Sequence, residues 1–497
     1  MFKLSHAIVA LAVIIFSSWV NAAAPVNDRP PNIIFILADD LGYGDTSIYG
    51  SEVIDTPHID SLAGSGVRFT NAYVSHPVCS PSRAGLLTGQ YQQRHGWEFN
   101  PMGQEFGHNK GLSLEVRTIA DELREQGYST GMVGKWHLGS DEKFHPLSRG
   151  FDEFYGILGG GSQYFESIPD GGAVALSSPV ERDAYKDVYR GFERVGTDKY
   201  LTDAFTDAAL SFIGDHEDEP YFLYLSHTTP HTPLQATKTY LDRYGHILDI
   251  PTRVYSAMVA SLDDSVGAVI RKLKESGQYE NTLIVFSSDN GCPDYIGNAC
   301  SNGNFAGFKR YHQDGGVRVP LILSWQGVIP SASVYAKTVT LLDLMSTFTS
   351  AAGKQIDTED GVNLMPFIAG NISSNPHEYL YWRSGPTMAI KDDRWKLIKY
   401  KRVKDTENDL RGADTLTPPQ NGWSVEAPLG HLTLLYDLQE DPGETTNLAD
   451  SHPEVVSRLG KAYSLWSQQL PPVEDAILPA RRSTITEIDD EAVQLIF

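Results

Sequence analysis

Cysteine, cations and long apolar runs are all scarce in this sequence of 497 residues. Three cysteines are too few for a fold held together mainly by disulfides. Lysine and arginine number 40 against 63 aspartates and glutamates, and the formal charge of −23 argues against a nucleic-acid partner. Beyond the N-terminus no stretch approaches the ~20 apolar residues that span a bilayer, so the mature chain is not expected to cross a membrane.

The N-terminal segment has the features of a signal peptide. Lys3 supplies a positive charge, residues 7–20 are apolar, and small residues at 20–24 offer a cleavage site. We predict that residues 1–22 are a signal peptide and that the mature protein is exported, either to the periplasm or to the medium. An uncleaved membrane anchor is the alternative, although the apolar run is short for one.

The rest of the composition is that of a large globular protein, with 41% apolar and 21% charged residues. From residue 30 to about 374, apolar runs with strand character alternate with helical segments, which predicts an α/β catalytic domain with a large, mostly parallel sheet. From about 375 to 497 the pattern predicts a smaller antiparallel α+β subdomain, with a hairpin over 388–400, a strand over 434–438 and a helix over 453–469. The polar stretch 404–430 is interpreted as an insertion.

Four of the predicted strands, at 32–38, 129–133, 221–226 and 282–287, end in residues suited to chemistry. These residues are Asp39 and Asp40, Lys135 and His137, His227 and His231, and Asp289 and Asn290. The carboxyl ends of parallel strands line one edge of a sheet, where ligands bind, so we expect one site. Adjacent carboxylates favour a hard cation such as Ca²⁺ or Mg²⁺, and a metal-dependent phosphatase would show a similar pattern.

The stretch from Cys79 to Gly89 is the most distinctive in the chain. Ser80 suits a helix N-cap and Pro81 the first helical position, which predicts a helix that begins just after Cys79. A helix N-terminus favours an anion, and Arg83 adds a positive charge one turn later. The stretch therefore combines a sulfur side chain with an anion site, although a buried free cysteine beside a helix cap is the simpler alternative.

The sequence Cys-Ser-Pro-Ser-Arg at 79–83, followed by Ala-Gly-Leu-Leu-Thr-Gly at 84–89, resembles the signature of the type I sulfatases. This family belongs to the alkaline-phosphatase-like superfamily, in which helices sandwich a large sheet. A formylglycine-generating or other sulfatase-maturing enzyme converts the signature cysteine to Cα-formylglycine. The resemblance covers about 31–469, including Tyr-Asp-Leu at 436–438 and Asp-Pro-Gly-Glu at 441–444. It implies that Cys79 is the precursor of a catalytic aldehyde and that the protein is a sulfuric ester hydrolase.

The resemblance also assigns roles to the predicted site residues. It implies one Ca²⁺, with ligands Asp39, Asp40, Asp289, Asn290 and the formylglycine from Cys79. It implies a catalytic set of Cys79, Arg83, Lys135, His137, His231 and Lys309. In this mechanism one hydroxyl of the aldehyde hydrate attacks sulfur and His231 protonates the leaving alcohol. His137 then takes the proton of the second hydroxyl, and sulfate leaves as the aldehyde returns.

Two further expectations depend on the resemblance. With Cys79 assigned to the aldehyde, Cys292 and Cys300 remain as an even pair that can form a disulfide in an oxidising compartment, and two free thiols are the alternative. A polar side chain that some family members place after the Gly-Phe-Asp segment has no clear match, and Gly160 or Ser162 could occupy its position.

The substrate implied by the resemblance is a sulfated carbohydrate, either an algal galactan such as carrageenan or a glycosaminoglycan. We expect exo action on sulfated galactose or N-acetylgalactosamine units. Candidate substrate contacts are His227, His145, Arg149 and Trp97, with Trp136, Tyr164, Phe165 and Trp382 as further possible stacking residues. The alternatives are a phosphatase or phosphonate hydrolase of the same superfamily, and an inactive glycan-binding relative.

Overall fold

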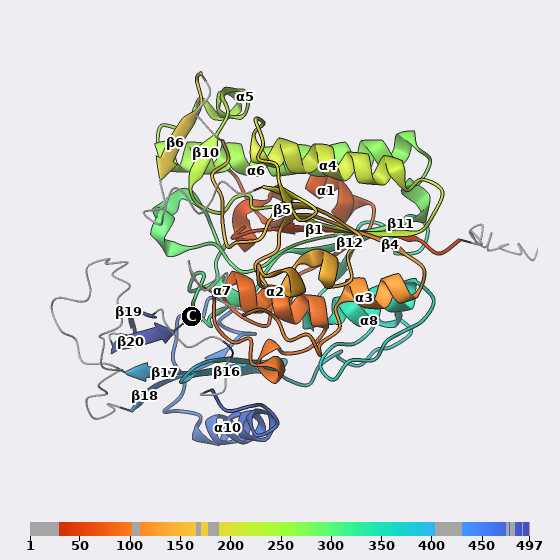
Figure 1. Cartoon of the computed structure of the whole chain (residues 1–497). Coiled ribbons are helices and arrows are strands. Elements are labelled where there is room, and N and C mark those ends of the chain that lie inside the picture. The colour runs from red at the N-terminus through yellow and green to blue at the C-terminus, as the bar shows by residue number, and fades with distance from the viewer. Residues whose placement is uncertain are drawn as a thin grey trace, which may run out of the picture.

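The structure is a computed structural model that describes residues 29–101, 110–165, 170–176, 188–402, 430–473, 477, 483–489 and 491–496. The predicted signal peptide (1–22) and all but the last residue of the predicted insertion (404–430) lie outside the described residues. Two sheets dominate the fold: a large one flanked by helices, and a smaller antiparallel one formed near the C-terminus (Figure 1).

The large sheet has ten described strands, and its centre is parallel. In spatial order they are β13 (Ser333–Tyr335), β2 (Val67–Phe69), β12 (Leu321–Ser324), β11 (Thr282–Ser288), β1 (Asn32–Ala38), β9 (Tyr221–Ser226), β4 (Ser129–Lys135), β5 (Glu153–Ile157), β7 (Tyr189–Arg190) and β8 (Glu193–Arg194). The run from β11 to β5 is parallel throughout, and antiparallel pairings lie toward the two ends. The prediction of a mostly parallel sheet is confirmed.

Helices cover both faces of this sheet (Figure 1). On one face lie α1 (Pro57–Gly64), α4 (Leu201–Asp215) and α6 (Ile250–Glu275); on the other lie α2 (Cys79–Thr88), α3 (Ile119–Glu125) and α8 (Asp343–Ala351). The central strand β1 is apolar at successive positions because both of its faces are covered. Phe35 packs into the core on the α2 side, whereas Ile34 and Ile36 pack into the core on the α6 side.

The smaller sheet is antiparallel and is covered by one long helix. Its strands are β15 (Leu380–Ser384), β16 (Thr387–Lys391), β17 (Trp395–Arg402), β18 (His431–Asp437), β19 (Ser483–Ile488) and β20 (Glu491–Ile496), and the helix is α10 (Pro453–Ser467). Trp382 and Tyr400 belong to the same apolar core as α2 and α8. The two sheets therefore share buried side chains.

Shorter elements complete the described fold. They are the pairs β10 (Leu234–Ala236) with β6 (Ala173–Leu176) and β14 (Val339–Thr340) with β3 (Ala72–Tyr73), and the helices α5 (Lys238–Leu241), α7 (Asp314–Val317) and α9 (Met365–Ile368). Within the described residues, none of the helices combines the length and the apolar character needed to cross a bilayer.

The start of α2 differs from the sequence prediction. The helix begins at Cys79, with Val78 as its N-cap, so Cys79 is the first helical residue and does not precede the helix. Ser80 does not act as the cap, because its hydroxyl donates to the carbonyl of His137 (2.6 Å) and accepts from Nε1 of Trp97 (2.8 Å). These two hydrogen bonds connect the start of α2 to the segment that follows β4 and to Trp97.

Candidate active site

Four adjacent strands deliver polar side chains to one edge of the large sheet. The strands β11, β1, β9 and β4 are neighbours and run in the same direction, so their carboxyl ends meet. The residues at or just after these ends are Asp289, Asn290, Asp39, Asp40, His227, His231, Lys135 and His137. Apart from His227, which contacts Ser265 on α6, these side chains form one cluster, as the strand-end pattern predicted.

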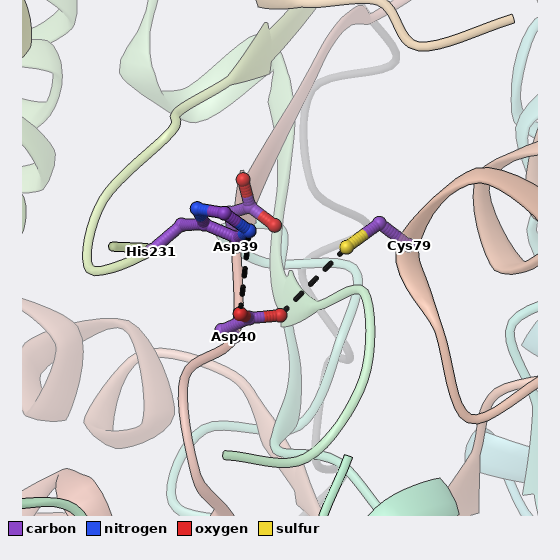
Figure 2. Close-up of side chains that lie close together, drawn as sticks. All are labelled: Asp39, Asp40, Cys79 and His231. Carbon is purple, nitrogen blue, oxygen red and sulfur yellow. Dashed lines mark hydrogen bonds and ion pairs between the residues drawn. The ribbon is translucent and has the colours of Figure 1, made fainter. Parts of the chain in front are cut away.

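Cys79 and His231 approach Asp40 from different sides (Figure 2). The Sγ atom of Cys79 lies 3.8 Å from Oδ1 of Asp40, and Nε2 of His231 lies 3.6 Å from Oδ2. One ligand atom each from Asp39, Asp40, Cys79 and His231 falls within 4.8 Å of the others. Burial raises the pKa of the Cys79 thiol above its ordinary value. The cysteine of the signature is thus enclosed with the carboxylates.

Arg83 is completely buried and lies one turn after Cys79 on α2. Its Nε and Nη2 atoms lie 2.8 and 2.7 Å from Oδ2 of Asp289, and its Nη1 donates to the carbonyl of Lys135 (3.0 Å) and to Oγ of Ser226 (2.6 Å). Burial opposes the charged guanidinium, but the neighbouring acidic groups, with Asp289 the largest contributor among them, together outweigh burial and raise the pKa of Arg83. Arg83 therefore joins α2 to the ends of β11, β4 and β9.

Two lysines face the carboxylates. Nζ of Lys135 lies 2.7 Å from Oδ2 of Asp39, and Nζ of Lys309 lies 2.7 and 2.8 Å from the two oxygens of Asp40. Burial raises the pKa of Asp39 to about 7, although Lys135 acts in the opposite direction. Burial alone would raise the pKa of Asp40, but the charges of Lys309 and His231 hold that pKa below its usual range. The two neighbouring carboxylates therefore differ in how readily they ionise.

The oxygen atoms of the cluster fit a hard divalent cation. Asn290 donates from Nδ2 to Oδ1 of Asp40 (2.7 Å), which leaves its own Oδ1 available. Among the described residues, nothing donates a hydrogen bond to the buried Oδ1 atoms of Asp39 and Asn290. Buried acceptors without a donor are costly, and a bound cation satisfies them. Asp40 has a φ of 64°, a left-handed conformation that aspartate tolerates and that turns its carboxylate toward the same cluster as that of Asp39.

Two histidines lie beside the cluster, and both are held away from the charged form. His231 donates from its Nδ1–H to the carbonyl of Thr232 (2.6 Å), and burial lowers its pKa to about 3. Burial and the charge of Lys135 also lower the pKa of His137. His137 has a φ of 66°, so the extended backbone of β4, which carries Lys135, does not continue to His137. A Cβ atom at Gly160 would lie 2.7 Å from Nε2 of His137, which places Gly160 directly against that ring.

The four residues that we predicted to contact the substrate are buried inside the fold, where they contact other parts of the protein. His227 is buried and its Nε2 meets Oγ of Ser265 on α6 (3.0 Å). Arg149 donates to the carbonyls of residues 112, 113 and 116, and the ring of His145 packs edge-on against Phe154. Trp97 has no exposed surface. These residues hold loops in place and do not offer a surface to a sugar, so the structure does not support their predicted role.

The further stacking candidates are also largely buried. Trp136, Tyr164 and Trp382 are each at most 1% exposed, and Phe165 is half-buried. Trp136 and Trp382 each donate from Nε1 to a backbone carbonyl, of Phe144 (2.9 Å) and Val74 (2.7 Å). Large aromatic side chains are as common in cores as at binding surfaces, which is why composition alone misplaced them.

Two residues of the site were missed from the sequence. Ser226, the last residue of β9, bridges Arg83 and the carbonyl of Lys135, and its position at a strand end was an available signal. The hydroxyl of Tyr295 donates to Oδ2 of Asp40 (3.3 Å). Tyr295 lies between Cys292 and Cys300, whose sulfur atoms are joined in a disulfide. A disulfide loop two residues beyond Asn290 was the signal that could have pointed to Tyr295.

Lysine and arginine side chains and a carboxylate cluster suited to a metal ion surround a buried cysteine at the carboxyl edge of a parallel sheet. This arrangement fits a hydrolase of anionic esters. A family model described as Sulfatase matches residues 31–354. The chain belongs to the sulfatase family, within the alkaline-phosphatase-like superfamily, and is a sulfuric ester hydrolase. The resemblance seen in the sequence is thereby confirmed.

Similar proteins include sulfatases with different named activities. N-acetylgalactosamine-6-sulfatase of Canis lupus familiaris is 32% identical over 477 residues, which cover 90% of this chain and 86% of the relative. Arylsulfatase A of Homo sapiens is 33% identical over 494 residues, covering 94% of this chain and 92% of the relative. The crystal structure of Ps i-CgsB matches with a TM-score of 0.75 and 32% identity over 89% of this chain and 94% of that one, and it is also known in complex with k-i-k-neocarrahexaose.

Proposed function

We propose that this sulfatase removes sulfate from sulfated saccharides, with Cys79 matured to formylglycine and one Ca²⁺ in the carboxylate cluster. The observation that carries the proposal is the position of Cys79. It is the first residue of α2, its Sγ is 3.8 Å from Asp40, and the cations of Lys309 and Lys135 lie on the adjoining carboxylates. A nucleophile at this place meets an anionic ester beside two lysines.

The aldehyde would supply chemistry that an unmodified thiol lacks. Its hydrate carries two hydroxyls, one to attack sulfur and a second whose deprotonation returns the aldehyde and releases sulfate. Arg83 holds the geometry of this step, because its guanidinium fixes the first turn of α2 against Asp289 and the end of β4. A maturing enzyme that recognises the Cys-Ser-Pro-Ser-Arg stretch is therefore an expected partner.

The lysines are assigned to charge neutralisation and the histidines to proton transfer. Lys135 and Lys309 neutralise sulfate oxygens, and fixed charges in a water-poor site stabilise a transition state more than they would in water. His231 is placed to protonate the leaving alcohol, and a bound sulfate ester adds negative charge beside its ring, which favours the protonated form. His137, whose backbone carbonyl accepts from the hydroxyl of Ser80 in the first turn of α2, is the residue to which we assign the proton of the second hydroxyl.

A cation would add positive charge to a site whose three carboxylates are already paired with Arg83, Lys135 and Lys309. Asp39, Asp40, Asp289 and Asn290 are the residues that would hold it, since two of their buried oxygens have no donor among the described residues. Oxygen ligands of this kind suit Ca²⁺, and the bound ion would draw negative charge onto itself as a Lewis acid. Lys135 and Lys309 would then be free to turn from the carboxylates toward the substrate.

Two relatives suggest the substrate class. One is named for N-acetylgalactosamine 6-sulfate, and another has been crystallised with k-i-k-neocarrahexaose, an oligosaccharide of the carrageenan type. Both contain galactose-type sugars, so we propose sulfated galactose or N-acetylgalactosamine units as the substrate, cleaved from a chain end. Export to the periplasm or the medium fits the predicted signal peptide and a polymeric substrate.

The test is a comparison of sulfate and phosphate release by one purified sample. The panel contains carrageenan oligosaccharides, N-acetylgalactosamine 6-sulfate, N-acetylgalactosamine 4-sulfate, glucosamine 6-sulfate and the matching phosphate esters. We expect sulfate release from at least one galactose-type saccharide at a rate far above release from any phosphate ester. Faster phosphate release would favour a phosphatase of the same fold, and release only from glucosamine 6-sulfate would contradict the proposed sugar.

A further inference from the structure

The disulfide loop, residues 292–300, carries an aromatic side chain that runs from the carboxylate cluster to the surface. The hydroxyl of Tyr295 donates to Oδ2 of Asp40 (3.3 Å), and Asp40 is 1% exposed. Tyr295 itself is 47% exposed. One end of this side chain therefore contacts the floor of the site while its ring reaches solvent. A residue with that placement can be reached from solvent and touches a carboxylate of the site.

Three kinds of contact hold the disulfide loop in place: a covalent bond, apolar packing and a hydrogen bond. The Cys292–Cys300 bond closes it, and Ile296 and Ala299 are buried in the apolar core that contains α6. The next residue, Ser301, donates its backbone N–H to Asp45 (2.8 Å), a buried carboxylate that also accepts from the hydroxyl of Tyr255 on α6 (2.6 Å). An aromatic ring on such a support loses little conformational entropy when a ligand binds.

Arg310 connects the ring of Tyr295 to the segment that precedes Cys79. Its guanidinium lies 5.4 Å from the centroid of that ring and forms an ion pair with Asp294. Its backbone N–H donates to the carbonyl of Pro77 (2.8 Å), two residues before Cys79. The ring is thus positioned from the segment that contains the cysteine as well as from its own loop.

Tyr295 and His231 flank the same atom. Nε2 of His231 lies 3.6 Å from Oδ2 of Asp40, the oxygen that accepts from Tyr295, and the side chain of His231 is 18% exposed. His231 is the proposed donor of the proton to the leaving alcohol. The sugar that carries the ester oxygen must therefore lie close to His231, and Tyr295 is the exposed aromatic ring beside it.

We propose that Tyr295 is a substrate-contacting residue whose ring stacks on the pyranose that bears the sulfate ester. The disulfide loop and Arg310 are the support that positions it. This inference rests on the proposed saccharide sulfatase function and adds the residue that recognises the sugar, as distinct from those that bind sulfate. An apolar sugar face against a fixed aromatic ring is a contact that the lysines of the floor cannot provide.

The test compares Tyr295→Ala with Tyr295→Phe on the saccharide of the panel above that gives the highest rate. We expect Tyr295→Ala to raise the KM about three- to ten-fold, the size of a stacking contact, and Tyr295→Phe to keep it close to wild type because the ring remains. Inorganic sulfate is expected to bind only beside Lys135 and Lys309, so its inhibition of the enzyme should be unchanged in both variants. In a Cys79→Ala background, calorimetry with the same saccharide is expected to show the same loss of affinity for Tyr295→Ala.

The matched control is Phe192→Ala. Phe192 is 52% exposed, and it lies in the turn after β7 at the amino end of β5, on the edge of the sheet opposite the site. Its KM is expected to equal that of wild type. An unchanged KM in Tyr295→Ala would overturn the inference, as would equal losses of kcat in Tyr295→Ala and Tyr295→Phe, since the hydroxyl would then be the active part. If wild type releases no sulfate from any saccharide, the proposed function fails separately, and saccharide binding by the Cys79→Ala pair still decides the role of Tyr295.

Discussion

At the scale of single residues, the site is a set of buried charges in which each member depends on its neighbours. Asp289 faces Arg83, Asp40 faces Lys309, and Asp39 faces Lys135, all at 2.7 Å. Removing one member of such a pair leaves the other charge buried and unpaired. Substitutions here therefore change both binding of an anion and the state of the remaining carboxylates.

Lys309 is expected to contribute through its charge. Lys309→Ala should lower kcat/KM for sulfate release by about 10²–10³, the loss seen when one fixed donor to a developing anion is removed. Lys309→Arg should recover part of the activity, because it keeps the charge but not the shape. Steady-state kinetics measure both, and equal activity of Lys309→Ala and wild type would remove Lys309 from the catalytic set.

The carboxylate cluster is expected to bind Ca²⁺ and thereby stabilise the fold. At a free Ca²⁺ concentration of about 100 times its Kd, the free energy of unfolding of chelator-treated protein should rise by about 2.7 kcal/mol. Asp39→Asn removes a charge from the cluster and should abolish most of that increase. Denaturant titration with and without Ca²⁺ provides the measurement, and an equal increase in Asp39→Asn would place the ion elsewhere.

At the scale of elements, the edge of the sheet that carries the site could be predicted from the sequence. The apolar run of β1 and its two carboxylates are adjacent in the chain, so local pattern and parallel-sheet topology together predicted the edge on which the site lies. Contacts between segments that are distant in the sequence could not be predicted in this way. The burial of Trp97 under α2 and the hydroxyl of Tyr295 on Asp40 depend on how loops fold back, and no periodicity encodes that.

The smaller sheet supports the segment that carries Lys309. Lys396 on β17 is buried with two carboxylates, at 2.7 Å from Oδ1 of Asp314 on α7 and 3.0 Å from Oε1 of Glu444. Lys396→Met should lower the free energy of unfolding by about 3–5 kcal/mol, because Glu444 loses its cation in the interior and Asp314 is left with Arg318. Chemical denaturation measures the loss. Lys399→Met, at a half-buried position on the same strand, is the control and should have little effect.

A histidine near the start of the smaller sheet should make stability depend on pH. Nε2 of His377 lies 2.8 Å from Oδ1 of Asp343, the first residue of α8. Burial disfavours the charged ring, but Asp343 outweighs it and raises the pKa of His377. A raised folded-state pKa stabilises the fold fully below the ordinary pKa of about 6.5, and this stabilisation disappears as the pH rises through the folded value. His377→Gln should lose stability relative to wild type at pH below about 6 and approach it at alkaline pH, as followed by urea unfolding.

At the scale of the whole molecule, an acidic protein acts on an anionic substrate. The formal charge of −23 repels a sulfated polymer at long range, whereas the lysines of the site attract one sulfate at short range. Raising the ionic strength from about 0.01 M to about 0.15 M shortens the screening length from ~30 Å to ~8 Å and removes mainly the long-range term. We therefore expect kcat/KM on a sulfated polysaccharide to rise over that range, and a steady fall with salt would show that local attraction dominates.

The chemical state of Cys79 is the central claim. Protein purified from a host that contains a sulfatase-maturing enzyme should be digested, and the peptide containing Cys79 analysed by mass spectrometry, while sulfate release is measured on the same sample. The account predicts that a fraction of the peptide carries the aldehyde, that sulfate release rises in proportion to that fraction, and that Cys79→Ala has no detectable activity. An active preparation in which Cys79 is entirely an unmodified thiol would contradict the account.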